Sequence, residues 1–284
     1  MMTEKRNLYD YYQIPAPAGA AGILSCWAAA TPRKVSAARQ RPAVLVLPGG
    51  AYHWTSPREM EPVALRFLAR GYAAFALDYS VAPFCFPVAL REAALAMRYI
   101  REHAGDFGVN PRMVAAVGFS AGAHLCGTLG TLYDAPEVSD LGDGALLRPD
   151  ALGLCYPVAI GWGNTHEMSF ETISGGDPGL RQRLSLDALV RPDMPPVFLW
   201  HTRDDASVPC RNSLVLAAAL DEMGIDFALH LYRHGQHGLS TGDAMVFPAH
   251  QVPEMSWDVP GWVDSMQKFF EEIGFQMTDR EDAQ

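Results

Sequence analysis

The sequence lacks the features that would direct a chain to a membrane or to nucleic acid. Its 284 residues contain no uninterrupted apolar run of about 18 residues, the length that a membrane-spanning helix needs. They contain no tract of Lys or Arg, and 22 basic against 32 acidic residues give a formal net charge of −10. Because this charge disfavours binding to phosphate groups, we expect neither a nucleic-acid nor a membrane partner.

Cysteines are few, and their spacing fits neither a disulfide framework nor a zinc site. The five are Cys26, Cys85, Cys126, Cys155 and Cys210, with no C-x-x-C pair. The apolar run that ends at Ala30 does not resemble a signal peptide, because acidic and aromatic residues precede it and prolines and glycines break it. We therefore expect free thiols in a reducing compartment, and a cytoplasmic protein.

What the sequence does contain is a repeated alternation of strand and helix patterns without low-complexity linkers. Apolar runs predict strands at 43–47, 73–77, 113–117, 151–156, 196–201 and 227–232. Helical periodicity predicts helices at 57–70, 88–103, 121–133, 213–223 and 262–273. Such alternation is typical of an α/β fold with a mostly parallel central sheet and helices on both faces.

We predict one domain over residues 1–284, since 49% hydrophobic residues suffice for a large core. Two stretches interrupt the alternation, 134–150 and 161–195. The second is long and rich in Gly, Asp, Ser and Pro. Loops of this length in a compact domain are often functional, so we predict a lid-like insert over 161–195.

The strongest chemical signal is the G-x-S-x-G pentapeptide at 118–122, between a predicted strand and a predicted helix. In this context the glycines permit a sharp, close-packed turn that exposes the Ser120 hydroxyl above the sheet. A glycine-rich helix start with a capping serine is the alternative. The pattern favours Ser120 as a nucleophile.

A serine hydroxyl needs a histidine base and a carboxylate to orient that base. Asp204 and Asp205 both follow the predicted strand that ends at His201, and both are candidates for the acid. His237 follows a later strand and has glycine two residues before it and directly after it, unlike His234. These two histidines lack a third metal ligand at suitable spacing, so we expect no metal.

With these motifs the chain resembles an α/β-hydrolase of the esterase/lipase group that includes acetyl-xylan and feruloyl esterase-like enzymes. Hormone-sensitive-lipase-like esterases are more distant relatives. The resemblance covers about Ala43 to Phe270. It rests on LPGGAY at 47–52, SPRE at 56–59, DYSVAP at 78–83, the pentapeptide, DASVP at 205–209 and GQHG at 235–238.

The resemblance implies residue roles. In the family, two residues stand between the acid and Val-Pro, which selects Asp205 over Asp204. The oxyanion hole would use the N–H groups of Gly50, Ala51 and Ala121, with alanine where the family usually has a third glycine. The residues that follow Ala51, namely Tyr52, His53 and Trp54, are candidates for substrate binding, although roles in packing are equally compatible with the sequence. We also expect an ion pair between Arg58 and Glu59.

The implied function is hydrolysis of short acyl esters through an acyl-enzyme on Ser120, with His237 as base and no metal or organic cofactor. Acetylated sugars or xylo-oligosaccharides are the specific expectation, and a generic short-chain carboxylesterase is close behind. Activity should fall on acidification as His237 takes up a proton. A prolyl-oligopeptidase-type peptidase, a non-catalytic binding protein and a homodimer remain compatible with the sequence.

Overall fold

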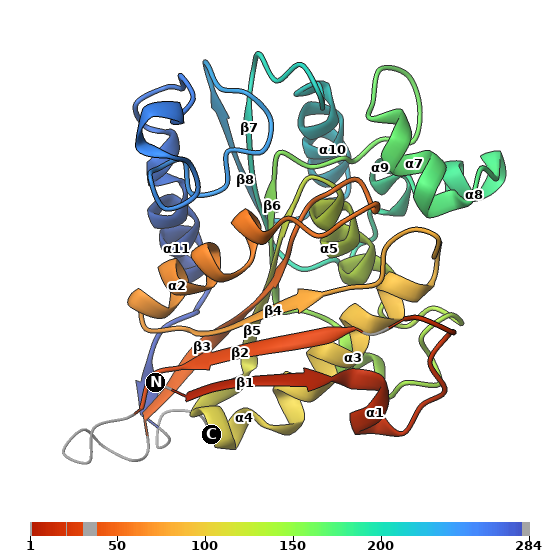
Figure 1. Ribbon diagram of the computed structural model, residues 1–284, viewed down its shortest axis with the longest axis vertical. Helices are drawn as coiled ribbons and strands as arrows, with labels where there is room; N and C mark the ends of the chain where they lie inside the picture. The colour runs from red at the N-terminus through yellow and green to blue at the C-terminus, as the bar shows by residue number, and fades with distance from the viewer. Residues whose placement is uncertain (1, 21, 31–38, 280–284) are drawn as a thin grey trace.

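The computed structural model describes residues 2–20, 22–30 and 39–279 (Figure 1). Its strands form one sheet in the order β1-β2-β4-β3-β5-β6-β7-β8, and β9 pairs with β3. Pairings β1–β2, β2–β4 and β3–β9 are antiparallel, and the others are parallel. The strands are β1 (Met2–Asn7), β2 (Ile23–Ala28), β3 (Arg39–Leu47), β4 (Ala73–Asp78), β5 (Val109–Phe119), β6 (Ala151–Cys155), β7 (Val197–Thr202), β8 (Phe227–Tyr232) and β9 (Thr278–Asp279).

Helices cover both faces of this sheet. They are α1 (Leu8–Tyr12), α2 (Glu61–Ala69), α3 (Val88–Glu102), α4 (Ala104–Phe107), α5 (Ala121–Leu132), α6 (Gly144–Leu147), α7 (Glu167–Ser174), α8 (Pro178–Arg183), α9 (Leu186–Leu189), α10 (Arg211–Glu222) and α11 (Trp262–Glu272). Short 3-10 turns are η1 (Pro57–Glu59), η2 (Ala249–Gln251) and η3 (Val259–Gly261). Among the described residues, no helix is both long enough and apolar enough to cross a membrane.

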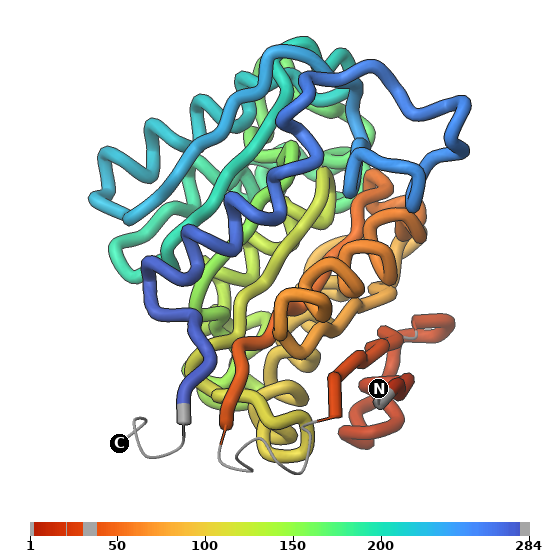
Figure 2. The backbone as a smooth tube through the Cα atoms, turned by 90° about the vertical axis from the view of Figure 1, so that its left-hand side faces the viewer, coloured from red at the N-terminus to blue at the C-terminus, as the bar shows by residue number. Residues whose placement is uncertain are grey.

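Each face of the sheet has its own hydrophobic core. Helices α2 and α11 pack on one face and appear in front of the strands in Figure 2, whereas α3, α5 and α10 pack on the other. Along β3, Val44 and Val46 contribute to the first core, and Leu45 and Leu47 contribute to the second. At the centre of the sheet, β6 and β7 are buried along their whole length because both of their faces are covered, which agrees with the predicted fold class.

The six predicted strands and five predicted helices are all present, with shifted ends. The predicted helix at 57–70 is divided at Met60, which has φ −108° and ψ −101°. Pro62 lacks an N–H and its ring would clash with the Arg58 carbonyl, so one helix cannot run through this stretch.

Strands β1 and β2 were not predicted from the sequence. The segment Met2–Asn7 is polar and lies at the sheet edge, where main-chain pairing with β2 holds it. An edge strand of this kind carries no apolar run for a sequence pattern to detect.

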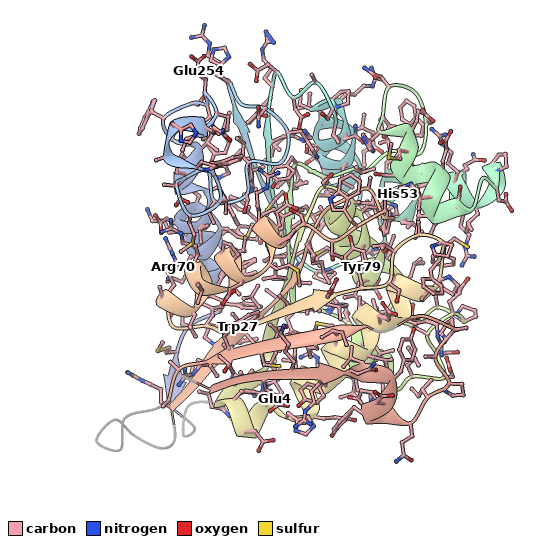
Figure 3. All side chains as sticks on the ribbon, in the orientation of Figure 1. Glu4, Trp27, His53, Arg70, Tyr79 and Glu254 are labelled. Carbon is pink, nitrogen blue, oxygen red and sulfur yellow. The ribbon has the colours of Figure 1, made fainter. Side chains whose placement is uncertain are left out.

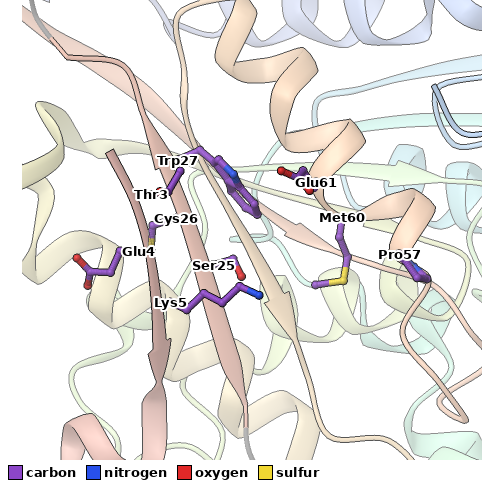
Figure 4. A pocket seen from close by; sticks show the side chains of 9 residues that line it. All are labelled: Thr3, Glu4, Lys5, Ser25, Cys26, Trp27, Pro57, Met60 and Glu61. Atoms are coloured by element: carbon purple, nitrogen blue, oxygen red, sulfur yellow. The ribbon is translucent and has the colours of Figure 1, made fainter. Parts of the chain in front are cut away.

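A cavity of about 570 Å³ lies between the β1–β2 pair and the start of α2 (Figure 4). The side chains of Lys5, Trp27 and Met60 border it. None of the predicted site residues lines this cavity. They lie instead at the carboxyl ends of the parallel strands, where ligands bind in open α/β sheets.

Candidate active site

Ser120 lies at the turn between β5 and α5, directly before the first helical residue. Its backbone has φ +54° and ψ −117°, a conformation that L-residues rarely adopt, and the residue is 8% exposed. A Cβ on Gly122 would lie 2.1 Å from the Leu47 carbonyl oxygen at the end of β3. Glycine is therefore required where the start of α5 crosses the end of β3, and this packing holds Ser120 at the sheet edge.

Hydrogen bonds connect Ser120, His237 and Asp205. The Ser120 Oγ lies 2.8 Å from His237 Nε2, and His237 Nδ1 lies 2.6 Å from Asp205 Oδ2. An ionised carboxylate only accepts, so Nδ1 carries the proton and Nε2 accepts from the serine hydroxyl. The three residues follow β5, β7 and β8, so strand ends distant in sequence converge at one edge.

The neighbouring Asp204 has a different partner. Its carboxylate accepts from the Gly235 N–H at 2.8 Å and lies 2.9 Å from His234 Nδ1. Both side chains of the Asp204–His234 pair are exposed. The structure therefore brings Asp205 to His237, as the resemblance implies, and leaves Asp204 outside the Ser120 site.

Asp205 is buried and has several donors around it. Its Oδ1 accepts from the N–H groups of Ser207 and Val208, each at 2.9 Å, and its Oδ2 lies 3.4 Å from His201 Nε2. Burial alone would raise the pKa of Asp205, but hydrogen bonds from His201 and His237 outweigh it and hold the pKa well below its usual range. The carboxylate is thus kept ionised beside His237.

The loop after β3 presents main-chain N–H groups beside Ser120. Gly50 has φ +129°, and a Cβ there would lie 2.0 Å from the Trp54 carbonyl oxygen. Ala51 has φ +56°, the left-handed region, which costs about 1–2 kcal/mol for a residue with a Cβ. Within the described ranges, the N–H groups of Gly50, Ala51 and Ala121 have no hydrogen-bond acceptor, so they are available to a substrate oxygen.

A pocket of about 270 Å³ opens over Ser120 and His237. It is lined by Gly50, Ala51, Trp54, Ser56, Arg58, Glu59, Ser120, His166, Met168, Ser207, His237 and Gly238. Of the three residues expected to bind substrate, Trp54 lines this pocket and two do not. Tyr52 is 2% exposed, because its ring turns into the core and its hydroxyl bonds His124 Nδ1 at 2.7 Å. His53, labelled in Figure 3, is exposed and does not line the pocket.

Two pocket residues that the sequence reading missed come from the insert 161–195. His166 and Met168 lie at the start of α7 and line the pocket. Burial lowers the pKa of His166, and the nearby His237 lowers it further. The length of the insert was the only sequence signal for these residues, and its role as a lid remains a prediction.

The expected ion pair between Arg58 and Glu59 is wrong. Glu59 turns inward and accepts from the Gly49 N–H at 2.8 Å and from the Tyr156 hydroxyl at 2.6 Å. Arg58 points elsewhere, and its guanidinium carbon lies 4.9 Å from the centre of the Phe247 ring. Consecutive residues of a helical turn project about 100–120° apart, so adjacent charges in sequence do not face each other.

Among the described residues, no group of three or more His, Cys, Asp or Glu side chains is arranged to hold a metal ion. The strand order, the serine turn and the acid and histidine after β7 and β8 define an α/β-hydrolase.

Comparisons with known proteins identify the family. The BD-FAE family model matches residues 31–144. A structure of an acetyl ester-xyloside bifunctional hydrolase from Caldicellulosiruptor lactoaceticus is 33% identical, with a TM-score of 0.82 over 96% of this chain and 97% of that one. The chain therefore belongs to the esterases of the α/β-hydrolase superfamily, in the acetyl-xylan and feruloyl esterase-like group.

Curated relatives agree with this placement but are longer. An endo-1,4-beta-xylanase B of Butyrivibrio fibrisolvens is 34% identical over 77% of this chain and 36% of its own length. An acetylxylan esterase of Xylanibacter ruminicola is 26% identical over 79% of this chain and 45% of its own length. The chain thus spans about a third to a half of the curated relatives it matches.

Proposed function

We propose that the protein hydrolyses short acyl esters, acetyl esters above all, through an acyl-enzyme on Ser120. The observation that carries the proposal is the hydrogen-bonded series from Ser120 through His237 to Asp205, next to main-chain N–H groups that have no acceptor among the described residues. Such a series activates a serine for attack on a carbonyl carbon.

In the first half-reaction, the Ser120 oxygen bonds to the ester carbonyl carbon while its proton passes to His237 Nε2. The N–H groups of Gly50, Ala51 and Ala121 stabilise the negative oxygen of the tetrahedral intermediate. His237 then gives its proton to the departing alcohol. In the second half-reaction it takes a proton from water, whose oxygen bonds to the acyl carbon. The bond between that carbon and Ser120 Oγ then breaks, the acid leaves, and His237 returns the proton to Ser120 Oγ. Asp205 keeps the ring in the required tautomer throughout.

The substrate proposal combines pocket size with the relatives. A pocket of about 270 Å³ is small, which favours a short acyl group, and Trp54 on its wall offers a flat apolar face of the kind that packs against a sugar ring. Two relatives are described as an acetylxylan esterase and an acetyl ester-xyloside hydrolase. We therefore propose acetylated xylo-oligosaccharides as the substrate class, with residues 161–195 acting as a substrate-binding insert through His166 and Met168.

The test is hydrolysis of p-nitrophenyl esters with acyl chains of two to twelve carbons, together with acetylated xylo-oligosaccharides. We expect the highest kcat/KM for the two-carbon ester. We expect Ser120→Ala to lower kcat/KM by at least about 10³-fold, because the nucleophile is lost. An unchanged circular dichroism spectrum is the control for folding. Equal activity of Ser120→Ala and wild type would refute the mechanism, and a preference for long chains would refute the substrate class.

A further inference from the structure

Glu59 is a buried carboxylate that the proposed reaction does not use, although it lines the pocket over Ser120. It is 3% exposed, and within the described part of the chain no Arg, Lys or His pairs with it. A buried charge without a cation is costly unless hydrogen bonds compensate it. The hydrogen bonds that Gly49 and Tyr156 donate therefore explain why the carboxylate is tolerated there.

These donors belong to the segments that carry the proposed reaction. Gly49 directly precedes Gly50 and Ala51, whose N–H groups bind the substrate oxygen in the proposed mechanism. The Tyr156 hydroxyl, which donates to Glu59, accepts in turn from the Ser240 N–H at 2.9 Å. Ser240 lies three residues after His237. One continuous series of hydrogen bonds thus joins the loop at residues 48–51, called the oxyanion loop below, to the loop that carries His237.

Tyr156 determines which groups donate and which accept along this series of hydrogen bonds. This residue is fully buried, and burial, followed by the Glu59 charge, raises the pKa of the phenol well above its usual value. The hydroxyl therefore stays protonated and donates to Glu59. Its ring also lies edge-on to the His237 ring, with the ring centres 5.0 Å apart.

Strained backbone is concentrated along the same series. Tyr156 has φ +38°, Ser240 has φ +51° and Ala51 has φ +56°. Non-glycine residues keep such conformations only where their surroundings hold them firmly. The hydrogen bonds of Glu59 act directly on Tyr156 and on Gly49, two residues before Ala51, and reach Ser240 through the tyrosine hydroxyl.

We propose that Glu59 is a positioning residue, which holds the N–H groups of the oxyanion loop in register with Ser120 and His237. This inference rests on the proposed ester hydrolysis. It assigns Glu59 to the geometry of the transition state and gives it no contact with the reacting atoms. Its loss should therefore weaken stabilisation of the oxyanion more than it weakens binding of the ester.

The principal variant is Glu59→Gln, because an amide cannot replace the carboxylate here. Both carboxylate oxygens accept, whereas a glutamine offers one oxygen and one NH₂ group. Either Gly49 or Tyr156 would then face a donor. Tyr156→Phe is the second variant, since it keeps the ring against His237 and removes only the hydroxyl. The matched control is Glu92→Gln, because Glu92 is also buried and accepts two bonds from Ser80 at 2.6 Å, but does not line the pocket over Ser120.

The experiment measures kcat and KM for p-nitrophenyl acetate, and the Kd of phenylboronic acid by calorimetry. The boronic acid bonds to the serine oxygen and places an oxygen in the oxyanion hole, so it reports the same geometry without turnover. For Glu59→Gln we expect kcat to fall about 10- to 100-fold and the boronic acid Kd to rise in parallel, with KM changed less than about threefold. Tyr156→Phe should change kcat and Kd in the same direction by a smaller factor.

The control separates positioning from general stability. Glu92→Gln should lower the unfolding temperature, yet leave kcat and the boronic acid Kd within about twofold of wild type at 20 °C. Unchanged kcat and Kd in Glu59→Gln or in Tyr156→Phe, beside normal wild-type activity, would overturn the positioning role alone. A wild-type protein that neither hydrolyses the acetate nor binds the boronic acid would overturn the esterase proposal and this inference with it.

Discussion

Two adjacent aspartates illustrate how much depends on the direction of a single side chain. Asp204 and Asp205 differ by one position, yet one reaches the exposed His234 and the other the ring of His237. Asp205 is buried and accepts two main-chain N–H groups, whereas Asp204 is exposed to water. The proposed mechanism therefore gives Asp205 the role of orienting His237 and gives Asp204 no role.

Replacing each aspartate by asparagine tests that assignment. Asp205→Asn should lower kcat/KM by about 10³- to 10⁴-fold, because an amide no longer holds His237 in the required tautomer. Asp204→Asn should lower it by less than about fivefold. The measurement is hydrolysis of p-nitrophenyl acetate at pH 7.5. If Asp204→Asn proves the more damaging change, Asp205 is not the acid.

At the scale of elements, the crossing of α5 over the end of β3 sets the height of Ser120 above the sheet. A Cβ on Gly122 would meet two carbonyl oxygens, at 2.1 Å from Leu47 and 2.3 Å from Pro48. Both are main-chain atoms, which cannot move aside as a flexible side chain can. Pro48 also begins the oxyanion loop, so a shift there reaches the N–H groups of Gly50 and Ala51.

We expect Gly122→Ala to destabilise the protein by about 1–3 kcal/mol or more, as overpacking against fixed backbone does. It should also reduce kcat/KM. The matched control is Gly105→Ala in α4, where nothing lies within 4 Å of the added methyl group. Because alanine favours a helix over glycine, this control should be neutral or slightly stabilising. Urea unfolding curves of the two variants measure the difference, and equal stabilities would contradict the close approach.

Across the whole molecule, His124 connects helix α5, the loop after β3 and the insert 161–195. It lies on α5, its Nδ1 accepts from the Tyr52 hydroxyl, and its Nε2 lies 2.8 Å from the carbonyl oxygen of Leu184 in the insert 161–195. Burial lowers the pKa of this ring to about 4. The neutral ring is therefore part of the folded state, and its protonation opposes folding.

This linkage predicts an acid-sensitive component of the free energy of unfolding. The unfolded ring binds a proton below about pH 6.5, whereas the folded ring resists it until about pH 4, so stability is lost as pH falls between these values. The loss amounts to roughly 3 kcal/mol at pH 4. His124→Gln lacks this component. Urea unfolding at pH 7, 6, 5 and 4 measures the free energy of unfolding of the variant and of wild type. The two free energies should converge as the pH falls, and a constant difference between them would contradict the linkage.

Much of the fold and part of the site could be predicted because their signals are local. Apolar runs and helical periodicity locate the central strands and helices, and the glycines around Ser120 mark a turn that few other residues permit. The order of Ser120, Asp205 and His237 also follows from short motifs. The polar strand β1, by contrast, has no apolar pattern, because main-chain pairing with β2 holds it at the edge of the sheet.

The sequence by itself determined the fold class and the residue types that the proposed acyl transfer uses, because backbone preference and hydrophobic burial act over short stretches of chain. The tertiary structure alone decided how side chains are directed. It turned Tyr52 and Glu59 inward, assigned the two aspartates to different histidines and brought His166 to the pocket. The Glu59–Tyr156 bond joins residues 97 positions apart. No local pattern specifies such a contact, because it depends on where several strand ends meet.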